Sequence, residues 1–220
     1  MQPIVLFALP VSGYSAKVRI TLEIKGINYE EREPPGGYRS AAYRAIVPMG
    51  TIPAIAVGDL VLSESEVIAE YLEERFPEPH MLPPEPELRA RIRFVSRFHD
   101  LYLEPAVRGL FAHVNPQRRD ESAVRARAQD IAGHVAKLDR FIGSGPFALT
   151  PWLSLADCGF ATTLPLARML LAATGRALTL TPRLEHWLSA IEQQPAVVKA
   201  LSRWRPATET WIAGQLGSQR

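Results

Sequence analysis

The sequence predicts an α/β domain over residues 1–77, followed by an all-α domain over residues 87–220, with a linker at 78–86. Three observations carry this prediction. Runs of β-prone residues are confined to the first third of the chain, and beyond it the apolar residues recur at helical spacing. Between the two, five prolines fall within ten residues after Phe76, which is typical of a semi-rigid connection.

The first part reads as strands alternating with helices. Residues 4–8 form a continuous β-prone run, typical of a strand covered on both faces, and 29–32 predict a second strand. Two further strands, 52–57 and 60–62, flank Gly58-Asp59, which is a hairpin signal. Helices are predicted at 15–25, where Gly26 ends the helix, at 38–46 and at 63–76. The order βαβαββα indicates a mixed sheet with helices packed on it.

The second part reads as helices throughout. The helices predicted from apolar spacing cover residues 87–113, 122–142, 155–174, 183–193 and 196–201. Pro105 lies inside the first of them and predicts a kink. Cys158 is interpreted as a small buried apolar residue, and Trp204 and Trp211 as packing residues.

Composition excludes several classes of function. The formal net charge is +2 and the basic residues are interleaved with acidic ones, so no nucleic-acid partner is expected. One cysteine allows no internal disulfide and fits a reducing compartment. We see no signal-peptide pattern and no apolar stretch near 18 residues, so we expect a cytoplasmic protein with no membrane partner. The five histidines show no metal-ligand spacing, so no metal is expected.

The segment Thr51-Ile52-Pro53 is the first of three that carry a possible chemistry. A proline that opens a strand is tolerated at a sheet edge or with a cis peptide bond. A cis bond would turn the amide and carbonyl of Ile52 outward, where an extended peptide could pair with them. The alternative is a simple turn proline.

The second segment is the start of the helix at 63–76. Its first turn leaves unpaired N–H groups, which favour a carboxylate, and Glu64 could hold an ammonium. Ser63 and Glu66 are also expected to form a capping box for this helix. That cap would leave Glu64 and Ser65 able to bind a ligand.

The third segment is the loop before the helix at 15–25. The hydroxyl of Ser12 could donate to a ligand thiolate and lower the thiol's pKa, and Tyr14 offers a second hydroxyl. The alternative for Ser12 is that it caps the helix, and for Ser15 capping is the preferred interpretation.

Mixed aromatic and polar side chains on the helix at 87–113 could line a pocket that faces the first domain: Phe98, Tyr102, Arg108, Phe111 and His113. The alternative is a helix that contributes only to core and surface.

Taken as a set, these motifs resemble the cytosolic glutathione transferase family, in particular its serine-type members of the bacterial zeta and tau kind. Residues 12–20 are similar to that family's Ser-x-x-x-x-(Lys/Arg)-Val-Arg-Ile, 47–55 to Asn-Pro-x-Gly-x-Val-Pro-x-Leu, and 64–72 to Glu-Ser-x-x-Ile-x-x-Tyr-Leu. Later in the chain, 154–157 resembles a helix capping box of the family, and 182–197 its late helices. The resemblance covers nearly the whole chain.

The resemblance implies a thioredoxin-like N-terminal domain, an all-helical C-terminal domain and glutathione as co-substrate. Ile52 and Pro53 would pair with the cysteinyl unit, Glu64 and Ser65 would hold the γ-glutamyl end, and Ser12 or Tyr14 would stabilise the thiolate.

For the glycyl carboxylate the resemblance suggests Arg39, with Arg44 as a second candidate. It also implies a homodimer, and a thiolate that attacks a small electrophile. A glutathione-dependent isomerase or dehalogenase and a non-catalytic binding module remain the alternatives. The first loop lacks the Ser-Ser-Cys of the zeta class, which argues against maleylacetoacetate isomerisation, and its lack of cysteine argues against thiol exchange.

Overall fold

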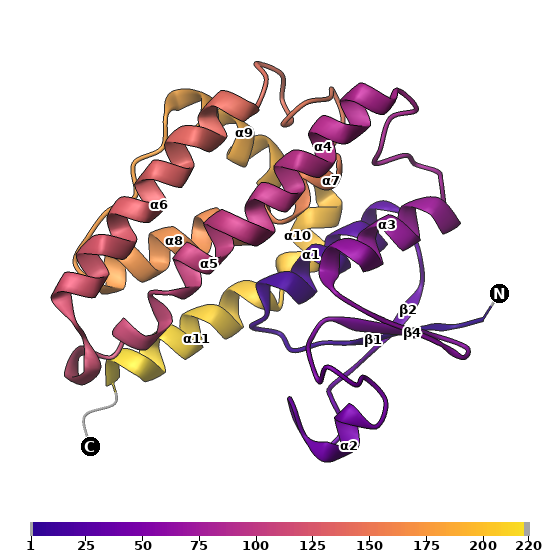
Figure 1. Cartoon of the computed structure of the whole chain (residues 1–220), viewed down its shortest axis with the longest axis horizontal. Helices are drawn as coiled ribbons and strands as arrows, with labels where there is room; N and C mark the ends of the chain where they lie inside the picture. The colour runs from indigo at the N-terminus through magenta and orange to yellow at the C-terminus, as the bar shows by residue number, and fades with distance from the viewer. Residues whose placement is uncertain (1, 218–220) are drawn as a thin grey trace.

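The computed structural model describes residues 2–217, and Figure 1 shows a small sheet domain packed against a larger helical part. The first part contains β1 (Ile4–Phe7), α1 (Gly13–Ile24), β2 (Tyr29–Arg32), α2 (Ala41–Arg44), β3 (Ala54–Val57), β4 (Leu60–Ser63) and α3 (Ser65–Arg75). The strand order is β2-β1-β3-β4, with β1 parallel to β2 and the other two pairs antiparallel. The predicted order and the mixed sheet are therefore confirmed.

Helices cover both faces of this sheet. Buried residues of α1 and α3, among them Val18 and Ile68, pack with Leu6 and Ile55 on one face. The short α2 packs Tyr43 against the other face. Because α1 and α3 lie on the side that meets the helical part, their polar first turns come to lie between the two domains (Figure 1).

The second part contains helices and connecting loops, and no strand lies among its described residues. It contains α4 (Pro86–Phe98), a π-helix (His99–Leu103), α5 (Glu104–Arg108), 3-10 turns (Phe111–His113 and Pro116–Arg118), α6 (Glu121–Phe141), α7 (Leu155–Cys158), α8 (Phe160–Ala173), α9 (Pro182–Glu192), α10 (Pro195–Leu201) and α11 (Trp204–Gly217). The last helix was not predicted. The fold class, an α/β domain of thioredoxin-like order followed by an all-α domain, agrees with the prediction.

The helix predicted at 87–113 is interrupted near Pro105. Proline has no N–H for the helical ladder, and here the turn before it widens into the π-helix His99–Leu103.

The segment Leu155–Ala173, formed by α7 and α8, is long and apolar enough to cross a membrane by length and composition alone. The prediction of no apolar stretch near 18 residues is therefore wrong for this segment. In the structure 83% of its apolar window is buried inside the protein, the usual position of a core helix.

The predicted capping box at 154–157 is present at the start of α7. The buried Asp157 carboxylate accepts hydrogen bonds from the backbone N–H and the hydroxyl of Ser154, both at 2.8 Å. It also accepts from the indole of Trp187 at 2.7 Å and from the Ala148 amide. One carboxylate thus joins α7, α9 and the loop before α7.

The proline-rich segment between α3 and α4 is held to the sheet domain. Lys25 and Glu73 form a buried ion pair of 2.6 Å. Lys25 donates to the carbonyls of Phe76 and Pro79, and Glu73 accepts from the amides of Met81 and Leu82. The division of the chain into 1–77, 78–86 and 87–220 stays a prediction. The backbone of the linker is held by hydrogen bonds to the charged side chains of Lys25 and Glu73.

Candidate functional site

A cavity of about 460 Å³ lies between the sheet domain and the helical part. Its walls come from the loop before α1, the loop before β3, the first turn of α3, the helices from α4 to α5, and α11. This size and position are typical of a site for a small ligand. Eight predicted site residues line it: Ser12, Tyr14, Ile52, Pro53, Glu64, Ser65, Arg108 and Phe111.

Ser12 caps α1, and its hydroxyl remains able to donate. Its Oγ accepts a hydrogen bond from the amide of Ser15 at 3.2 Å. Because a serine hydroxyl accepts and donates at the same time, capping leaves its proton for a ligand in the cavity. The two interpretations of Ser12 are therefore compatible. Ser15 is not the cap, since it lies inside α1.

Tyr14 lies in the same wall of the cavity, near negatively charged carboxylates. Burial raises the pKa of its phenol, and the carboxylates of Glu104 and Asp100 raise it further, against an opposing effect of Arg108. The phenol therefore stays protonated. These carboxylates also disfavour a second anion beside the Tyr14 hydroxyl.

The Ile52-Pro53 peptide bond is cis, as the sequence allowed. The loop that carries it is anchored by the buried Tyr43, whose hydroxyl donates to the carbonyl of Thr51 at 2.8 Å. In the described part of the chain the backbone N–H and C=O of Ile52 have no hydrogen-bond partner. An extended peptide in the cavity can pair with them.

The first turn of α3 differs from the prediction in one respect. The predicted Ser63–Glu66 capping box is wrong, because Ser63 ends β4 and the N-cap is Glu64, which makes no side-chain cap. Glu64 has a φ of 76°, a conformation that costs a non-glycine residue about 1–3 kcal/mol. The amides at the start of α3 thus remain available to an anion.

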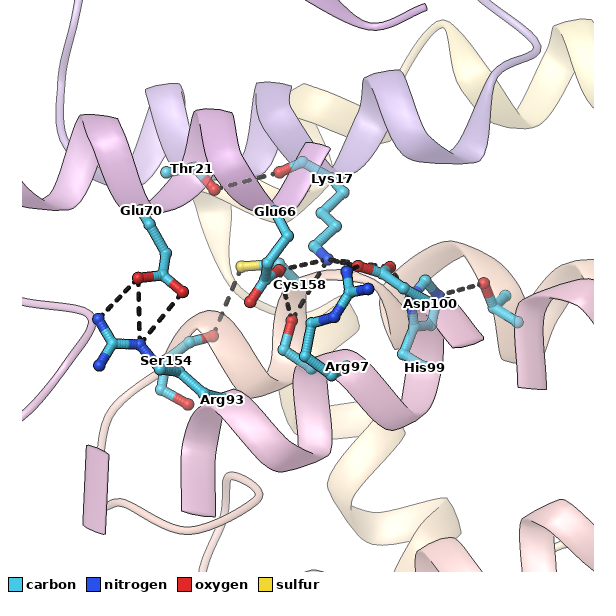
Figure 2. A network of polar contacts seen from close by, with 12 residues as sticks. Lys17, Thr21, Glu66, Glu70, Arg93, Arg97, His99, Asp100, Ser154 and Cys158 are labelled. Atoms are coloured by element: carbon cyan, nitrogen blue, oxygen red, sulfur yellow. Dashed lines mark hydrogen bonds and ion pairs between the residues drawn. The ribbon is translucent and has the colours of Figure 1, made fainter. Parts of the chain in front are cut away.

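Glu66 instead joins a buried ion network behind the cavity (Figure 2). The ammonium of Lys17 lies 2.6 Å from Glu66 and 3.1 Å from Asp100, and it donates to Ser96. Burial alone would lower the pKa of Lys17, but the two carboxylates outweigh it and the pKa is raised. Burial likewise opposes ionisation of Asp100, yet hydrogen bonds and charges from His99 and Lys17 bring its pKa down to about 2. The network joins α1 and α3 to the helical part.

The far end of the cavity is aromatic and carries a cation. The guanidinium of Arg108 lies 5.0 Å from the ring of Phe111 and 5.9 Å from that of Tyr14. Phe111 packs against Trp211 at 5.0 Å. The buried hydroxyl of Thr208 also lines this end and has no partner in the described residues. Such walls suit a flat, apolar molecule with a polar substituent.

Four predicted site residues do not line the cavity. Phe98 is buried and packs against Phe141 at 5.1 Å, while Tyr102 stacks on Phe98 and is 53% exposed. His113 lies in a 3-10 turn, where its ring accepts from the amide of Asp120. The guanidinium of Arg39 lies 4.9 Å from the ring of Tyr38, and it is the Tyr38 side chain that reaches the cavity.

Sequence reasoning missed the face of the helix that lines the site. Arg97, Leu101, Glu104, Arg108 and Phe111 line the cavity, at spacings of three and four residues. That period was available from the sequence and would have grouped Glu104 with Arg108 in place of Phe98 and Tyr102. Trp211 and Thr208 gave no such signal, because α11 reaches the site from the other end of the chain. Among residues 2–217 no group of acidic, histidine or cysteine side chains is placed to hold a metal ion.

Comparison with known proteins agrees with this fold. A family model described as the N-terminal domain of glutathione S-transferase matches residues 6–80. A maleylacetoacetate isomerase from Pseudomonas aeruginosa is 31% identical over 206 residues, which is 90% of this chain and 95% of that protein. A stringent starvation protein A homolog from Coxiella burnetii is 40% identical over 90 residues, 41% of this chain and 43% of that protein.

The solved structure of Rice GST1 in complex with glutathione has the same fold, with a TM-score of 0.83 over 97% of this chain and 96% of that one, at 24% identity. With the thioredoxin-like and helical domains in this order, the full-length match defines the class: the chain belongs to the cytosolic glutathione S-transferase family.

Proposed function

We propose that this protein is a glutathione S-transferase that binds glutathione in the interdomain cavity and stabilises its thiolate for attack on a small apolar electrophile. The observation that carries the proposal is that the Ser12 hydroxyl, the open edge at cis-Pro53 and the first turn of α3 line one cavity. The hydroxyl can donate to sulfur, the open edge can pair with a peptide backbone, and the first turn of the helix can bind a carboxylate.

Glutathione would lie extended along this wall. Its cysteinyl unit would pair with the Ile52 backbone, and its γ-glutamyl end would lie at Glu64 and Ser65. The carboxylate of Glu64 at that end suits an ammonium, and the amides of α3 suit the adjacent carboxylate. Arg39 stays the proposed partner of the glycyl carboxylate, since its guanidinium lies against Tyr38 at the cavity wall.

Absorbance tests the proposal directly. Bound glutathione should develop a thiolate band between pH 6 and 7, well below the ordinary thiol pKa of about 8.5. Addition of an aromatic halide should then consume glutathione. Binding without a thiolate band, or no binding at all, would contradict the transferase proposal.

A second function, glutathione-dependent isomerisation, is favoured by two observations. The relative matched over almost the whole chain is named an isomerase, and Arg108 places a cation where an acidic substrate could bind. Recovery of glutathione after turnover would indicate an isomerase, and its consumption a transferase. A non-catalytic binding module remains the third alternative, which glutathione binding without turnover would favour.

Ser65→Ala is expected to weaken glutathione binding more than turnover. The change removes a hydroxyl at the γ-glutamyl end while leaving the thiol site intact, so KM for glutathione should rise about 5- to 10-fold, which corresponds to a hydrogen bond of about 1 kcal/mol, with kcat nearly unchanged. Steady-state kinetics at saturating electrophile measure this. A lower kcat at constant KM would place Ser65 at the reacting atoms instead.

A second copy of this chain is the proposed protein partner. Exposed apolar side chains lie on α3 and on the neighbouring helix of the helical part: Val67, Phe94, Leu101 and Tyr102. The 2.6 Å ion pair Arg93–Glu70 holds these two helices side by side. Apolar surface of this kind is typical of an interface.

Val67→Glu, at a position 51% exposed, is therefore expected to convert a dimer into a monomer without loss of fold. Light scattering coupled to size exclusion measures the mass, and circular dichroism checks the fold. A wild-type monomer at micromolar concentration would contradict the dimer.

A reducing, cytoplasmic location remains our proposal, in line with the buried free thiol of Cys158.

A further inference from the structure

A buried row of polar side chains connects two points of the cavity wall. The imidazole of His99 lies 2.8 Å from Asp100 through Nδ1 and 2.7 Å from the hydroxyl of Thr163 through Nε2. That hydroxyl lies 2.5 Å from Oε2 of Glu104. Asp100 and Glu104 both line the cavity, while His99 and Thr163 are buried behind it. Figure 2 shows His99 beside Asp100.

The three contacts require one more proton than the Thr163 hydroxyl and a neutral His99 imidazole supply together. Each contact needs one hydrogen between two heavy atoms. The Thr163 hydroxyl supplies one hydrogen and a neutral imidazole supplies a second. If both carboxyl groups are ionised, the third hydrogen must come from a doubly protonated His99, which donates to Asp100 and to Thr163 while Thr163 donates to Glu104. Imidazolium and Glu104 carboxylate then neutralise one another across a single hydroxyl.

The surrounding charges fit this assignment. Asp100 also faces Lys17 of α1 and Arg97 of α4, so its negative charge is already balanced. His99 otherwise meets the rings of Tyr14 and Phe160, and within residues 2–217 its imidazole has no cation partner. Glu104 faces one cation, Arg108, at 3.9 Å. The cost of burying the Glu104 charge is thus offset chiefly by the hydrogen bond from Thr163 and by the positive charge of His99.

The second oxygen of Glu104 faces the loop where a thiol would lie. Oε1 makes no hydrogen bond in the described chain, and it would lie 3.9 Å from a Cβ atom built on Gly13, between Ser12 and Tyr14. A carboxylate at this point opposes formation of a thiolate unless it takes the thiol's proton.

We propose that Glu104 is the base that accepts the thiol proton of bound glutathione, and that His99 and Thr163 are positioning residues that hold the compensating charge. This inference rests on the proposed function. The S–H bond breaks, its electron pair stays on sulfur, and the proton forms an O–H bond on Oε1. Thr163 continues to donate to Oε2. After addition to an activated alkene the carbanion takes this proton back; after displacement of a halide the proton leaves to water.

The number of protons released on binding tests the proposal. Wild-type protein is mixed with glutathione at pH 6.5 in weak buffer with an indicator dye, and thiolate absorbance is read in parallel. S-methylglutathione, which has no thiol proton, corrects for all other titrations. We expect a thiolate band with far less than one proton released per thiolate, because Glu104 keeps the proton. Release of one proton per thiolate would overturn the inference while leaving the transferase function intact, whereas absence of the thiolate band would contradict the function itself.

Variants test whether Glu104 is the base and whether Thr163 and His99 position it. Glu104→Gln should lower kcat/KM on the order of 10²-fold, the usual effect of losing a general base, and any thiolate that still forms should release its proton to the buffer. Thr163→Val should also increase proton release, and Thr163→Ser should restore the wild-type value, since serine keeps the hydroxyl. If Glu104→Gln does not fold, the wild-type measurement and the two Thr163 variants still test whether the thiol proton stays in the site. Equal proton release in Thr163→Val, Thr163→Ser and wild type would overturn the role of His99 and Thr163.

Discussion

Ser12→Ala is expected to remove the thiolate band of bound glutathione at neutral pH and to lower kcat/KM about 10- to 150-fold. A hydrogen bond to an anion contributes about 1.5–3 kcal/mol, which converts to that range of rate. The Ser12 oxygen accepts from the Ser15 amide, and within residues 2–217 the hydroxyl donates to no other group, so its proton is free for a ligand. Ultraviolet difference absorbance across pH 5–9 and steady-state kinetics measure the two effects.

Tyr14→Phe is the matched control for this experiment. The carboxylate of Asp100 acts on the Tyr14 phenol and disfavours a thiolate there, also when Glu104 carries the thiol proton. The variant should therefore keep the band and change kcat/KM by a few-fold at most, through packing against His99 and Arg108. Loss of the band in Tyr14→Phe with its retention in Ser12→Ala would reverse the assignment.

Lys17→Met is expected to cause the largest loss of stability, about 3–5 kcal/mol in the free energy of unfolding. The methionine matches the length of the lysine stem but leaves Glu66 and Asp100 without their ammonium. Both carboxylates are nearly buried, at 7% and 10% side-chain exposure, so water cannot replace the missing charge. Urea denaturation followed by tryptophan fluorescence measures the loss.

Lys199→Met provides the comparison. Lys199 also pairs with a carboxylate, Glu23, at 2.6 Å, but its side chain is 74% exposed. Surface pairs contribute about 0–1 kcal/mol, so this variant should unfold close to wild type. Similar losses for the two variants would mean that burial does not set the cost of removing Lys17.

Local motifs in the sequence were sufficient for the order of strands and helices over residues 1–77, for the cap at Ser154 and Asp157, and for the residues of the loops that meet the cavity, and they allowed the cis bond at Pro53. Each of these depends on neighbours within a few positions: a proline in a tight turn, a serine before a helix, a glycine after one. Because such interactions form inside one segment, their residue types carry the information.

Contacts between segments required the tertiary structure. Glu66 has the spacing of a capping residue, yet it pairs with Lys17 of another helix. Glu104 and Arg108 line the cavity, whereas Phe98 packs against Phe141 of another helix. Trp211 joins Phe111 across about one hundred residues of chain. Helical periodicity defines a face but not the partner that the face meets, because that choice is made by packing energy summed over distant segments.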